Sequence, residues 1–230
     1  MAKDAKSAFC EDSRVKFPTL MHLMGMGFKY VSLKGLKTKY VEAPKTEFDP
    51  LTNILTDYFT DAYCTLNPKA EKKDAEDMLV KIQKSLQNDD LGRQFYNEIL
   101  LNTGERIIDL SSPVNFYKNN TFQVATEMTC GSKDSDNYRP DITIFVNGLP
   151  LAFIEVKKEN NHKGIQAETD RMKQRFVNPQ YRRFLNITQI MVFSNDMEYD
   201  NNEVTPTIGA FYATIGKKNT KYNCFREEGQ

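Results

Sequence analysis

Hydrophobic residues recur with a helical period in the first half of the chain. Asp49-Pro50 and Asn67-Pro68 each combine a helix-capping residue with a proline suited to the first helical position, so each predicts a helix start. A third helical segment spans about residues 90–102, and Gly104 is suited to its C-terminal cap. The apolar positions are Leu51, Ile54, Leu55, Tyr58, Phe59 and Ala62 in the first helix, Ala75, Met78, Leu79, Ile82 and Leu86 in the second, and Phe95, Ile99 and Leu100 in the third.

The period changes to two after Glu105, which predicts β-strands. Asn147-Gly148 separates two runs of β-branched and aromatic residues, and this dipeptide predicts a β-hairpin over 139–157. A helix is predicted over 163–177, with Ile165, Met172 and Phe176 on one face. The remaining predicted strands are 28–33, 106–110, 121–128, a buried parallel strand at 188–194, 206–214 and 222–225, with polar loops at 129–137 and 195–206.

This order of elements predicts an α/β fold in which helices flank a mixed β-sheet and a helical region precedes the core. The chain has 230 residues, which suits one sizeable domain. We expect residues 1–45 to form an N-terminal arm, 46–104 a helical region packed on the core, and 105–230 the core itself. Residues 46–230 are then one compact domain.

Composition excludes several classes of protein. No run approaches the roughly 18 apolar residues of a membrane span, and the N-terminus lacks the apolar core of a signal peptide. Four widely spaced cysteines predict reduced thiols and a cytoplasmic protein, and two histidines disfavour a histidine-based metal site or triad. No phosphate-binding loop, dinucleotide fingerprint or serine-hydrolase motif is present in the sequence.

Charge is balanced overall but not locally. Residues 1–41 and residues 157–183 each carry eight Lys/Arg against three Asp/Glu, a net of +5 in each segment. Because the net charge of the chain is zero, the remainder carries −10. Two basic segments on an acidic body indicate either a polyanion-binding face or ordinary solvated surfaces.

Acidic and basic residues gather at one end of the predicted hairpin: Asp141 begins its first strand, and Glu155 and Lys157 end its second. A strict two-residue turn would put Asp141 and Glu155 on opposite faces of the sheet. A three-residue loop, which pairs Asp141 with Phe153, or a β-bulge would put both carboxylates on one face. We predict one of these two irregularities.

Two carboxylates on one face, with the main-chain carbonyl of Val156 beside them, form an oxygen-only ligand set that suits Mg²⁺. With a phosphate ester as substrate, Lys157 could position or deprotonate an attacking water, or stabilise charge on phosphorus. The basic helix that follows could hold a phosphate backbone. The alternative is that these are solvated residues at the ends of ordinary strands.

The residues Arg139-Pro140-Asp141, the segment 145–151 (Phe-Val-Asn-Gly-Leu-Pro-Leu) and the segment 154–158 (Ile-Glu-Val-Lys-Lys) resemble the N-terminal nuclease domain of the R subunit of type I restriction enzymes, a PD-(D/E)xK nuclease. The likeness extends from about Glu47 to Arg226. The resemblance implies a restriction-endonuclease-like fold and Mg²⁺-dependent cleavage of double-stranded DNA. It makes Asp141 and Glu155 metal ligands and Lys157 the catalytic lysine.

The chain departs from the family at two points. Some members use a Glu on the first helix; Glu47, just before Asp49, could fill that role, and the alternative is a plain helix-flanking Glu. Members often carry Gln-x-x-x-Tyr on the helix after the lysine. Here the residue four positions after Gln166 is Asp170, and the residue four positions after Gln174 is Asn178, so neither glutamine has the tyrosine. Accessory candidates are Glu47, Glu168, Arg171 and Gln174. Candidate DNA-binding residues are Lys158, Lys163, Arg171, Lys173, Arg175, Arg182 and Arg183.

R subunits continue into an ATP-driven DNA-translocating motor, so the resemblance implies that this chain is a fragment of a longer polypeptide. ATP would then act only through that motor. The expected partners are double-stranded DNA and the modification and specificity subunits, with no membrane. Two alternatives stay open: a DNA-binding or subunit-docking module whose nuclease site is silent, and a structure-specific resolvase on the same fold.

Overall fold

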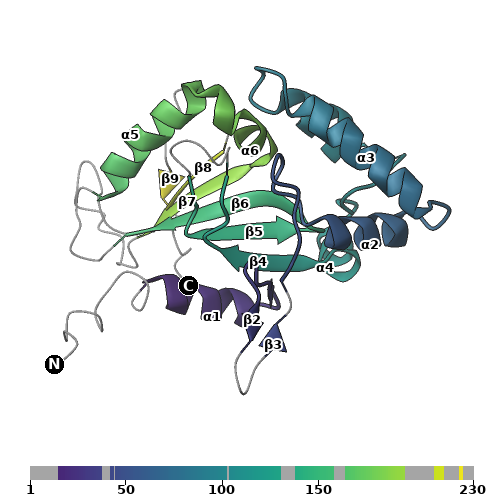
Figure 1. Ribbon diagram of the computed structural model, residues 1–230, viewed down its shortest axis with the longest axis horizontal. Coiled ribbons are helices and arrows are strands. Elements are labelled where there is room, and N and C mark those ends of the chain that lie inside the picture. Colours follow the sequence, from purple (N-terminus) through teal and green to yellow (C-terminus); the bar gives the residue numbers. More distant parts are fainter. Residues whose placement is uncertain are drawn as a thin grey trace.

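The computed structural model describes residues 15–37, 42–43, 45–102, 104–130, 138–157, 164–194, 210–214 and 223–224. In these residues a seven-stranded mixed β-sheet has helices on both faces, which confirms the predicted α/β architecture (Figure 1). The arrangement is consistent with a restriction-endonuclease-like fold.

The sheet has its hairpin at the centre. Parallel pairing joins β1 to β4 and β6 to β7, and the other neighbours are antiparallel. In sheet order the strands are β1 (Lys29–Tyr30), β4 (Phe122–Thr126), β5 (Ile142–Val146), β6 (Leu149–Val156), β7 (Ile190–Ser194), β8 (Ala210–Thr214) and β9 (Asn223–Cys224). A separate two-stranded sheet pairs β2 (Leu36–Lys37) with β3 (Glu42–Ala43).

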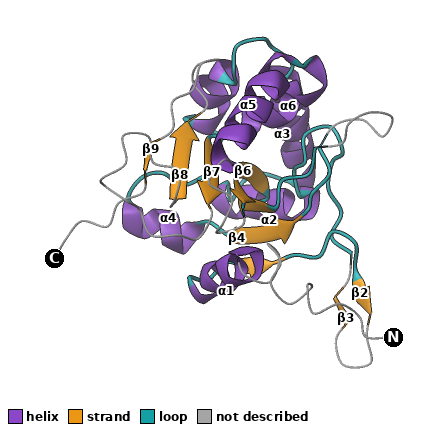
Figure 2. Ribbon diagram, turned by 90° about the vertical axis from the view of Figure 1, so that its left-hand side faces the viewer, coloured by secondary structure: helices purple, strands orange, loops and turns teal. Residues whose placement is uncertain are grey.

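Each face of the sheet has its own helical cover, as Figures 1 and 2 show. On one face lies α1 (Phe17–Gly25), whose Leu20 and Leu23 pack against a cluster that includes Ile142, Ile154 and Val156. On the other face lie α5 (Gly164–Val177), the 3₁₀-helix η4 (Pro179–Tyr181) and α6 (Arg182–Ile187). Their apolar residues pack with the second cluster, which contains Tyr138, Phe153, Met172, Phe184 and Phe193.

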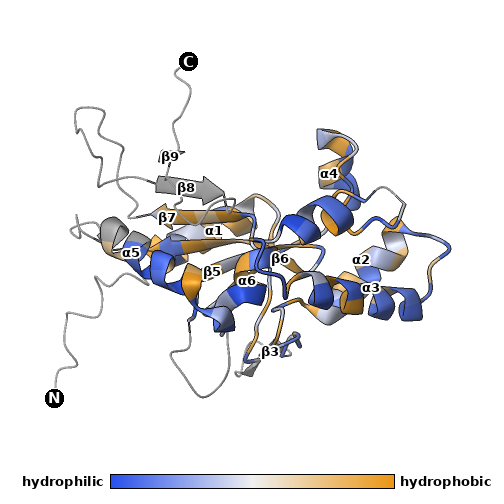
Figure 3. Ribbon diagram, turned by 90° about the horizontal axis from the view of Figure 1, so that it is seen from above, coloured by the Kyte–Doolittle hydropathy of each residue, from blue (hydrophilic) through white to orange (hydrophobic). Residues whose placement is uncertain are grey.

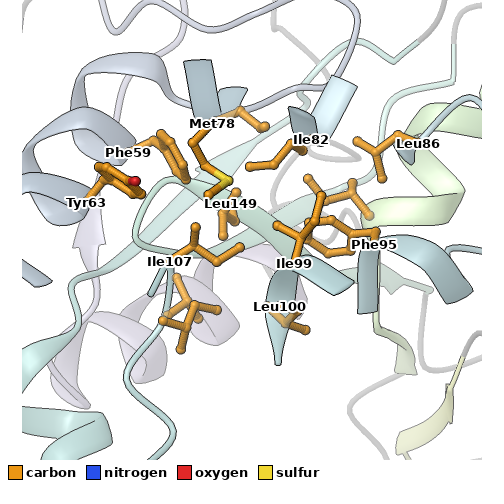
Figure 4. Packing of buried hydrophobic residues seen from close by; sticks show 14 of the residues in the cluster. Phe59, Tyr63, Met78, Ile82, Leu86, Phe95, Ile99, Leu100, Ile107 and Leu149 are labelled. Atoms are coloured by element: carbon orange, nitrogen blue, oxygen red, sulfur yellow. The ribbon is translucent and has the colours of Figure 1, made fainter. Parts of the chain in front are cut away.

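The helical region packs around the turn end of the hairpin. It contains α2 (Thr56–Leu66), α3 (Lys72–Ser85) and the π-helix η3 (Phe95–Leu100), and the short helix α4 (Pro113–Asn119) follows it in the chain. Seen from above, α2, α3 and α4 lie at one end of the sheet and α5 at the other (Figure 3). Leu149, the first residue of β6, inserts among Phe59, Met78, Ile82 and Ile99 (Figure 4). The hairpin therefore joins a helical core at one end to the polar residues at the other.

Both predicted helix starts are wrong by several residues. Asp49 accepts hydrogen bonds from Leu51 N (2.9 Å) and Thr52 Oγ1 (2.7 Å), and so stabilises a turn. Asn53 then has a φ of 62°, outside the helical region, and α2 begins only at Thr56. Leu51 is consequently exposed rather than inward. The second helix begins at Lys72, where the Asp74 carboxylate accepts a hydrogen bond from the backbone N–H of Glu71.

The predicted strand at 106–110 is also wrong, because asparagine side chains take the place of a neighbouring strand. Asn67 Oδ1 accepts from Arg106 N (3.1 Å), and Asn120 Oδ1 accepts from Asp109 N (2.9 Å). The backbone is thus satisfied without a ladder, while Ile107 stays buried as an apolar anchor. The sequence analysis also missed α4, which begins after Ser112.

The other predicted elements are confirmed within the described residues, except the cap at Gly104, which is wrong because the third helical segment already ends with Leu101 as its C-cap residue. Phe95, Ile99 and Leu100 are buried in the third helical segment, which is a π-helix, and β7 is the predicted parallel strand. Strands β1, β4, β8 and β9 fall within predicted ranges. Loop residues 131–137 and 195–206 and the side chain of Ile165 lie outside the described residues.

Candidate active site

The turn of the hairpin is a two-residue turn, and a β-bulge corrects its register. Asn147 and Gly148 have φ values of 51° and 76°, the combination of a type I′ turn. The predicted three-residue loop is therefore wrong. The predicted bulge is confirmed, because Leu151 is an extra residue between two of the pairs. The paired residues are Val146–Leu149, Phe145–Pro150, Ile144–Ala152, Thr143–Phe153 and Ile142–Ile154.

This register has a direct consequence for the acidic residues. Because Ile142 pairs with Ile154, the same register sets the preceding Asp141 opposite Glu155, and the negative charge of Asp141 acts on the Glu155 carboxylate. Without the bulge the two carboxylates would point to opposite faces. One inserted residue in β6 thus brings the acids together.

The turn itself is buried. Asn147 is 0% exposed; its side chain donates to Ile107 O (2.9 Å) and Asn120 Oδ1 (2.8 Å) and accepts from Thr121 N (2.8 Å). Gly148 O accepts from Leu55 N at the start of α2 (2.9 Å). The helical region therefore holds the hairpin by its turn.

The carboxylate of Asp141 is held by two neighbours. Its Oδ2 accepts from Val156 N (2.9 Å), and its Oδ1 lies 3.9 Å from Lys16 Nζ. Lys16 also donates to Glu127 Oε1 (3.1 Å), and this contact, with the positive charge, lowers the pKa of Glu127. Glu127 sits at the end of β4 with a φ of 51°, and its N–H donates to Asp141 O. A lysine and a third carboxylate thus flank Asp141.

Glu155 is buried beside two other carboxylates. Its Oε1 accepts a 2.6 Å hydrogen bond from the hydroxyl of Tyr138. Burial, followed by the negative charges of Asp141 and Glu168, raises the pKa of Glu155 to about 8, although Tyr138 and Lys157 act in the opposite direction. Glu155 is therefore largely protonated at neutral pH, and it would ionise more readily beside an added cation.

Lys157 follows β6 and faces the same cluster. Its backbone N–H donates to Ser194 O (2.7 Å). Its ammonium lies 3.9 Å from Glu155 Oε2 and 3.5 Å from Glu168 Oε2, and its side chain is only 14% exposed. The pairing with Glu168 holds the ammonium at the carboxylates rather than in solvent.

Glu168 is the point at which α5 enters the site. It is buried, and its oxygens accept from Arg171 (2.9 Å) and Arg175 (2.8 Å). Burial would raise the pKa of Glu168, but the hydrogen bond from Arg175 and the charges of Lys157, Arg175 and Arg171 outweigh it, so the net shift is downward. Glu168 is therefore an anion that orders three cations.

Comparison with known families identifies this chain. The family model described as "Type I restriction enzyme R protein N terminus" matches residues 9–204. The chain belongs to this family. A relative from Methanocaldococcus jannaschii, named "Putative type I restriction enzyme MjaIXP endonuclease subunit", is 26% identical over 226 residues. That match covers 90% of this chain but 20% of the relative, so the chain spans about a fifth of the length of the curated relative it matches.

Several residues predicted from the sequence of this R-protein N-terminal domain lie close together in the structure: Asp141, Glu155, Lys157, Glu168, Arg171 and Arg175. The other accessory candidates make different contacts or lie in solvent. Glu47 is exposed and pairs with Lys45 (3.0 Å), and Gln174 is exposed on α5.

The predicted DNA-binding residues differ in their surroundings. Lys173 is half-exposed, and its Nζ forms an ion pair with Asp170 Oδ1 (3.1 Å). Arg182 Nη1 donates a hydrogen bond to Gln87 O (3.4 Å). Arg183 is partly buried in α6. Arg175 lies inside the cluster, with its side chain 20% exposed. Lys158 and Lys163 lie outside the described residues.

Three site residues were not predicted: Tyr138, Lys16 and Glu127. Lys16 and Glu127 are 111 positions apart, so no local pattern could have linked them. Tyr138 precedes Asp141 by three residues, and this closeness in sequence is the only feature that could have pointed to Tyr138 as a site residue.

Two features are absent from the described part of this chain. It contains no set of three histidine, cysteine or carboxylate side chains gathered for a metal ion. An ion at this site would therefore need backbone or water oxygens in addition to Asp141 and Glu155. None of its helices is both long enough and apolar enough to span a membrane.

Proposed function

We propose that this chain is the endonuclease domain of a type I restriction enzyme and hydrolyses phosphodiester bonds of double-stranded DNA with Mg²⁺. One observation carries the proposal: the bulged hairpin sets Asp141 against Glu155 on one face, with the Lys157 ammonium 3.9 Å from Glu155 Oε2. Paired carboxylates beside a lysine form a site suited to an oxygen-bound cation and an anionic substrate.

The donor set suits Mg²⁺ in its chemistry. Asp141, Glu155 and the carbonyl of Val156 offer only oxygen atoms, which this ion prefers. Burial, followed by the negative charges of Asp141 and Glu168, raises the pKa of Glu155, and a divalent cation beside it would favour the ionised carboxylate. When bound, Mg²⁺ supplies Lewis acidity and a more acidic water.

The protein residues have separate roles in this proposal. Val156 N and Lys16 hold Asp141, so its carboxylate is preorganised. Lys157 stabilises negative charge at the phosphate or positions the attacking water. Glu168 holds the ammonium of Lys157 at the site.

The DNA backbone would be bound by exposed basic residues near this face. Arg171 and Lys173 on α5 have side chains 61% and 52% exposed, which leaves them accessible to phosphates. Lys158, Lys163, Arg182 and Arg183 remain candidates for the same role. Because Arg175 is bound to Glu168 within the cluster, we assign it to the site instead.

We further propose that the domain works in the cytoplasm within a complex containing modification and specificity subunits. The family relationship and the relative's name support this assembly. ATP would be used by a motor elsewhere in the R subunit.

The proposal is tested by comparing nicking of supercoiled plasmid in Mg²⁺ and in EDTA. Asp141→Asn keeps the size of the side chain but removes its charge, and we expect it to abolish cleavage. Asp61→Asn changes an exposed aspartate in α2 and should cleave like the native chain. The same pair should be tested in the R subunit assembled with its partners, because this chain spans about a fifth of the length of the relative it matches.

The alternatives predict different results. DNA binding without Mg²⁺-dependent cleavage, both alone and in the complex, would favour a docking module with a silent site. Preferential cleavage of four-way junctions over linear duplex would favour a resolvase. Cleavage that survives Asp141→Asn would refute the assignment of the site.

A further inference from the structure

Tyr138 is fixed in the core while its hydroxyl reaches the site. The residue is 5% exposed, and its backbone carbonyl accepts from Cys130 N (2.8 Å). Its ring makes edge-on contacts with Phe153, Tyr181 and Phe184, with centroids 5.8–6.2 Å apart. From this frame the hydroxyl donates the 2.6 Å hydrogen bond to Glu155 Oε1.

Arg175 holds the same ring from its face. Its guanidinium carbon lies 3.8 Å from the centroid of Tyr138, a close cation–π contact. The guanidinium also donates to Glu168 Oε1 (2.8 Å), and Glu168 lies two turns earlier on the same face of α5. The position of Tyr138 therefore depends on α5 as well as on the aromatic cluster.

These contacts close into a ring around the site. Glu168 Oε2 lies 3.5 Å from Lys157 Nζ, which lies 3.9 Å from Glu155 Oε2. The two oxygens of Glu155 thus have different neighbours: Oε1 accepts the hydrogen bond from the Tyr138 hydroxyl, and Oε2 faces the Lys157 ammonium. Rotation of the carboxylate would break the 2.6 Å bond inside a buried region, where an unpaired polar group is costly.

We propose that Tyr138 is a positioning residue: its hydroxyl, braced by Arg175, fixes Glu155 so that Oε2 is presented to the metal ion. The inference rests on the proposed function, since it assigns Glu155 to a metal. The inference adds two residues to the candidate site: Tyr138, which belongs to the aromatic core cluster, and Arg175, which belongs to α5. Supports that orient metal ligands typically contribute 10- to 100-fold to metal affinity.

The test measures metal affinity directly. Binding of Mg²⁺ and of Mn²⁺ to the 230-residue chain is titrated by calorimetry for the native protein, Tyr138→Phe and Tyr63→Phe, with the melting temperature measured in EDTA. Tyr138→Phe removes one oxygen and keeps the ring, so we expect about 10-fold weaker binding or more. Tyr63→Phe alters a buried tyrosine in the helical core and should bind metal like the native chain.

Cleavage kinetics separate positioning from general stability. For Tyr138→Phe, the Mg²⁺ concentration at half-maximal rate should rise about 10-fold or more, while the rate at saturating Mg²⁺ is largely regained. A purely structural role would lower the melting temperature without changing the Mg²⁺ dependence. Native affinity in Tyr138→Phe would overturn the inference.

Arg175 supplies a second, independent test. Arg175→Gln should weaken metal binding in the same direction, and the double variant should lose less than the sum of the two single effects, because both act through one contact. Additive effects would refute the coupling between Arg175 and Tyr138.

Two negative results have different meanings. If the native chain binds metal no better than Asp141→Asn, the proposed metal site itself fails. If the native chain binds metal and Tyr138→Phe binds it equally well, only the positioning role of Tyr138 is overturned.

Discussion

Gly148, the one glycine of the hairpin, should not tolerate a side chain, and Gly148→Ala tests that expectation. Its φ is 76°, a conformation that costs a residue with a Cβ about 1–2 kcal/mol. An added methyl would also lie 2.6 Å from Leu55 O and 2.9 Å from Phe59 N, so the hairpin and α2 would have to separate. Separation would weaken the Leu55 N–H to Gly148 O hydrogen bond, which contributes about 0.5–1.5 kcal/mol.

Together these effects predict a loss of about 1.5–3.5 kcal/mol in the free energy of unfolding. For a chain of this size that loss lowers the melting temperature by roughly 3–14 °C. Urea denaturation followed by circular dichroism, with a thermal melt beside it, measures both quantities. The loss is a large share of the roughly 5–15 kcal/mol that stabilises a typical domain.

Gly25→Ala is the matched control. Gly25 ends α1, and an added methyl there meets no atom within 4 Å. Because alanine favours a helix, this change should be neutral or raise stability by up to about 1 kcal/mol. Equal melting temperatures for the two alanine variants would show that the turn relaxes without cost and would refute the reasoning.

Three further changes have separate expected outcomes. Thr143 is fully buried, and its Oγ1 has no hydrogen-bond partner among the described residues, so Thr143→Val should raise the free energy of unfolding by about 1 kcal/mol; a loss on urea denaturation would reveal a bound water or another partner. Burial raises the pKa of Glu155 from 4.5 to about 8 in the folded chain, so between these pH values the folded state binds a proton that the unfolded state has lost. The free energy of unfolding in EDTA should therefore fall as the pH rises from about 4.5 to about 8. Denaturation at several pH values should show a shallower fall for Glu155→Gln, and an unchanged slope would contradict the shift. Lys81 and Glu105 form an exposed ion pair (2.9 Å), so Lys81→Ala should change stability by less than about 1 kcal/mol; a larger change in the urea midpoint would show that the pair does more than surface pairs usually do.

Local patterns predicted the parts of the fold that local physics decides. Asn147-Gly148 marks the hairpin because both positions need positive φ, and the continuous apolar run at 188–194 marks a buried parallel strand. The need to bring Asp141 to the face of Glu155 was enough to predict a bulge, although the sequence did not distinguish the bulge from a longer loop.

The errors arose where distant side chains replaced local interactions. The segment after Glu105 has the alternation of a strand, but Asn67 and Asn120 satisfy its backbone from elsewhere in the chain. The Asp49 carboxylate resembles a helix cap in sequence, yet it also accepts from the side chain of Gln83 in α3 (2.8 Å) and stabilises a turn. Such contacts depend on the assembled fold, so local propensity could not reveal them.

The same limit applies to the candidate site. Asp141, Glu155 and Lys157 are close in sequence and share a hairpin, which made them predictable. Tyr138 lies in the segment before β5 and contacts Glu155, and Lys16 lies just before α1 and contacts Asp141. Both contacts form only when the sheet is complete. Sequence therefore predicted the candidate residues of the site, whereas the structure was needed to find the groups that contact them.

The buried turn has a consequence for how this domain tolerates change. Turns are usually the places where chains accept insertions, tags or new termini, because they lie in solvent. Here Asn147 and Gly148 are anchored to α2 and to the segments before β4. A library of single insertions across the chain should therefore show one of its least permissive positions at the dipeptide that, by sequence alone, would be chosen first for opening the loop.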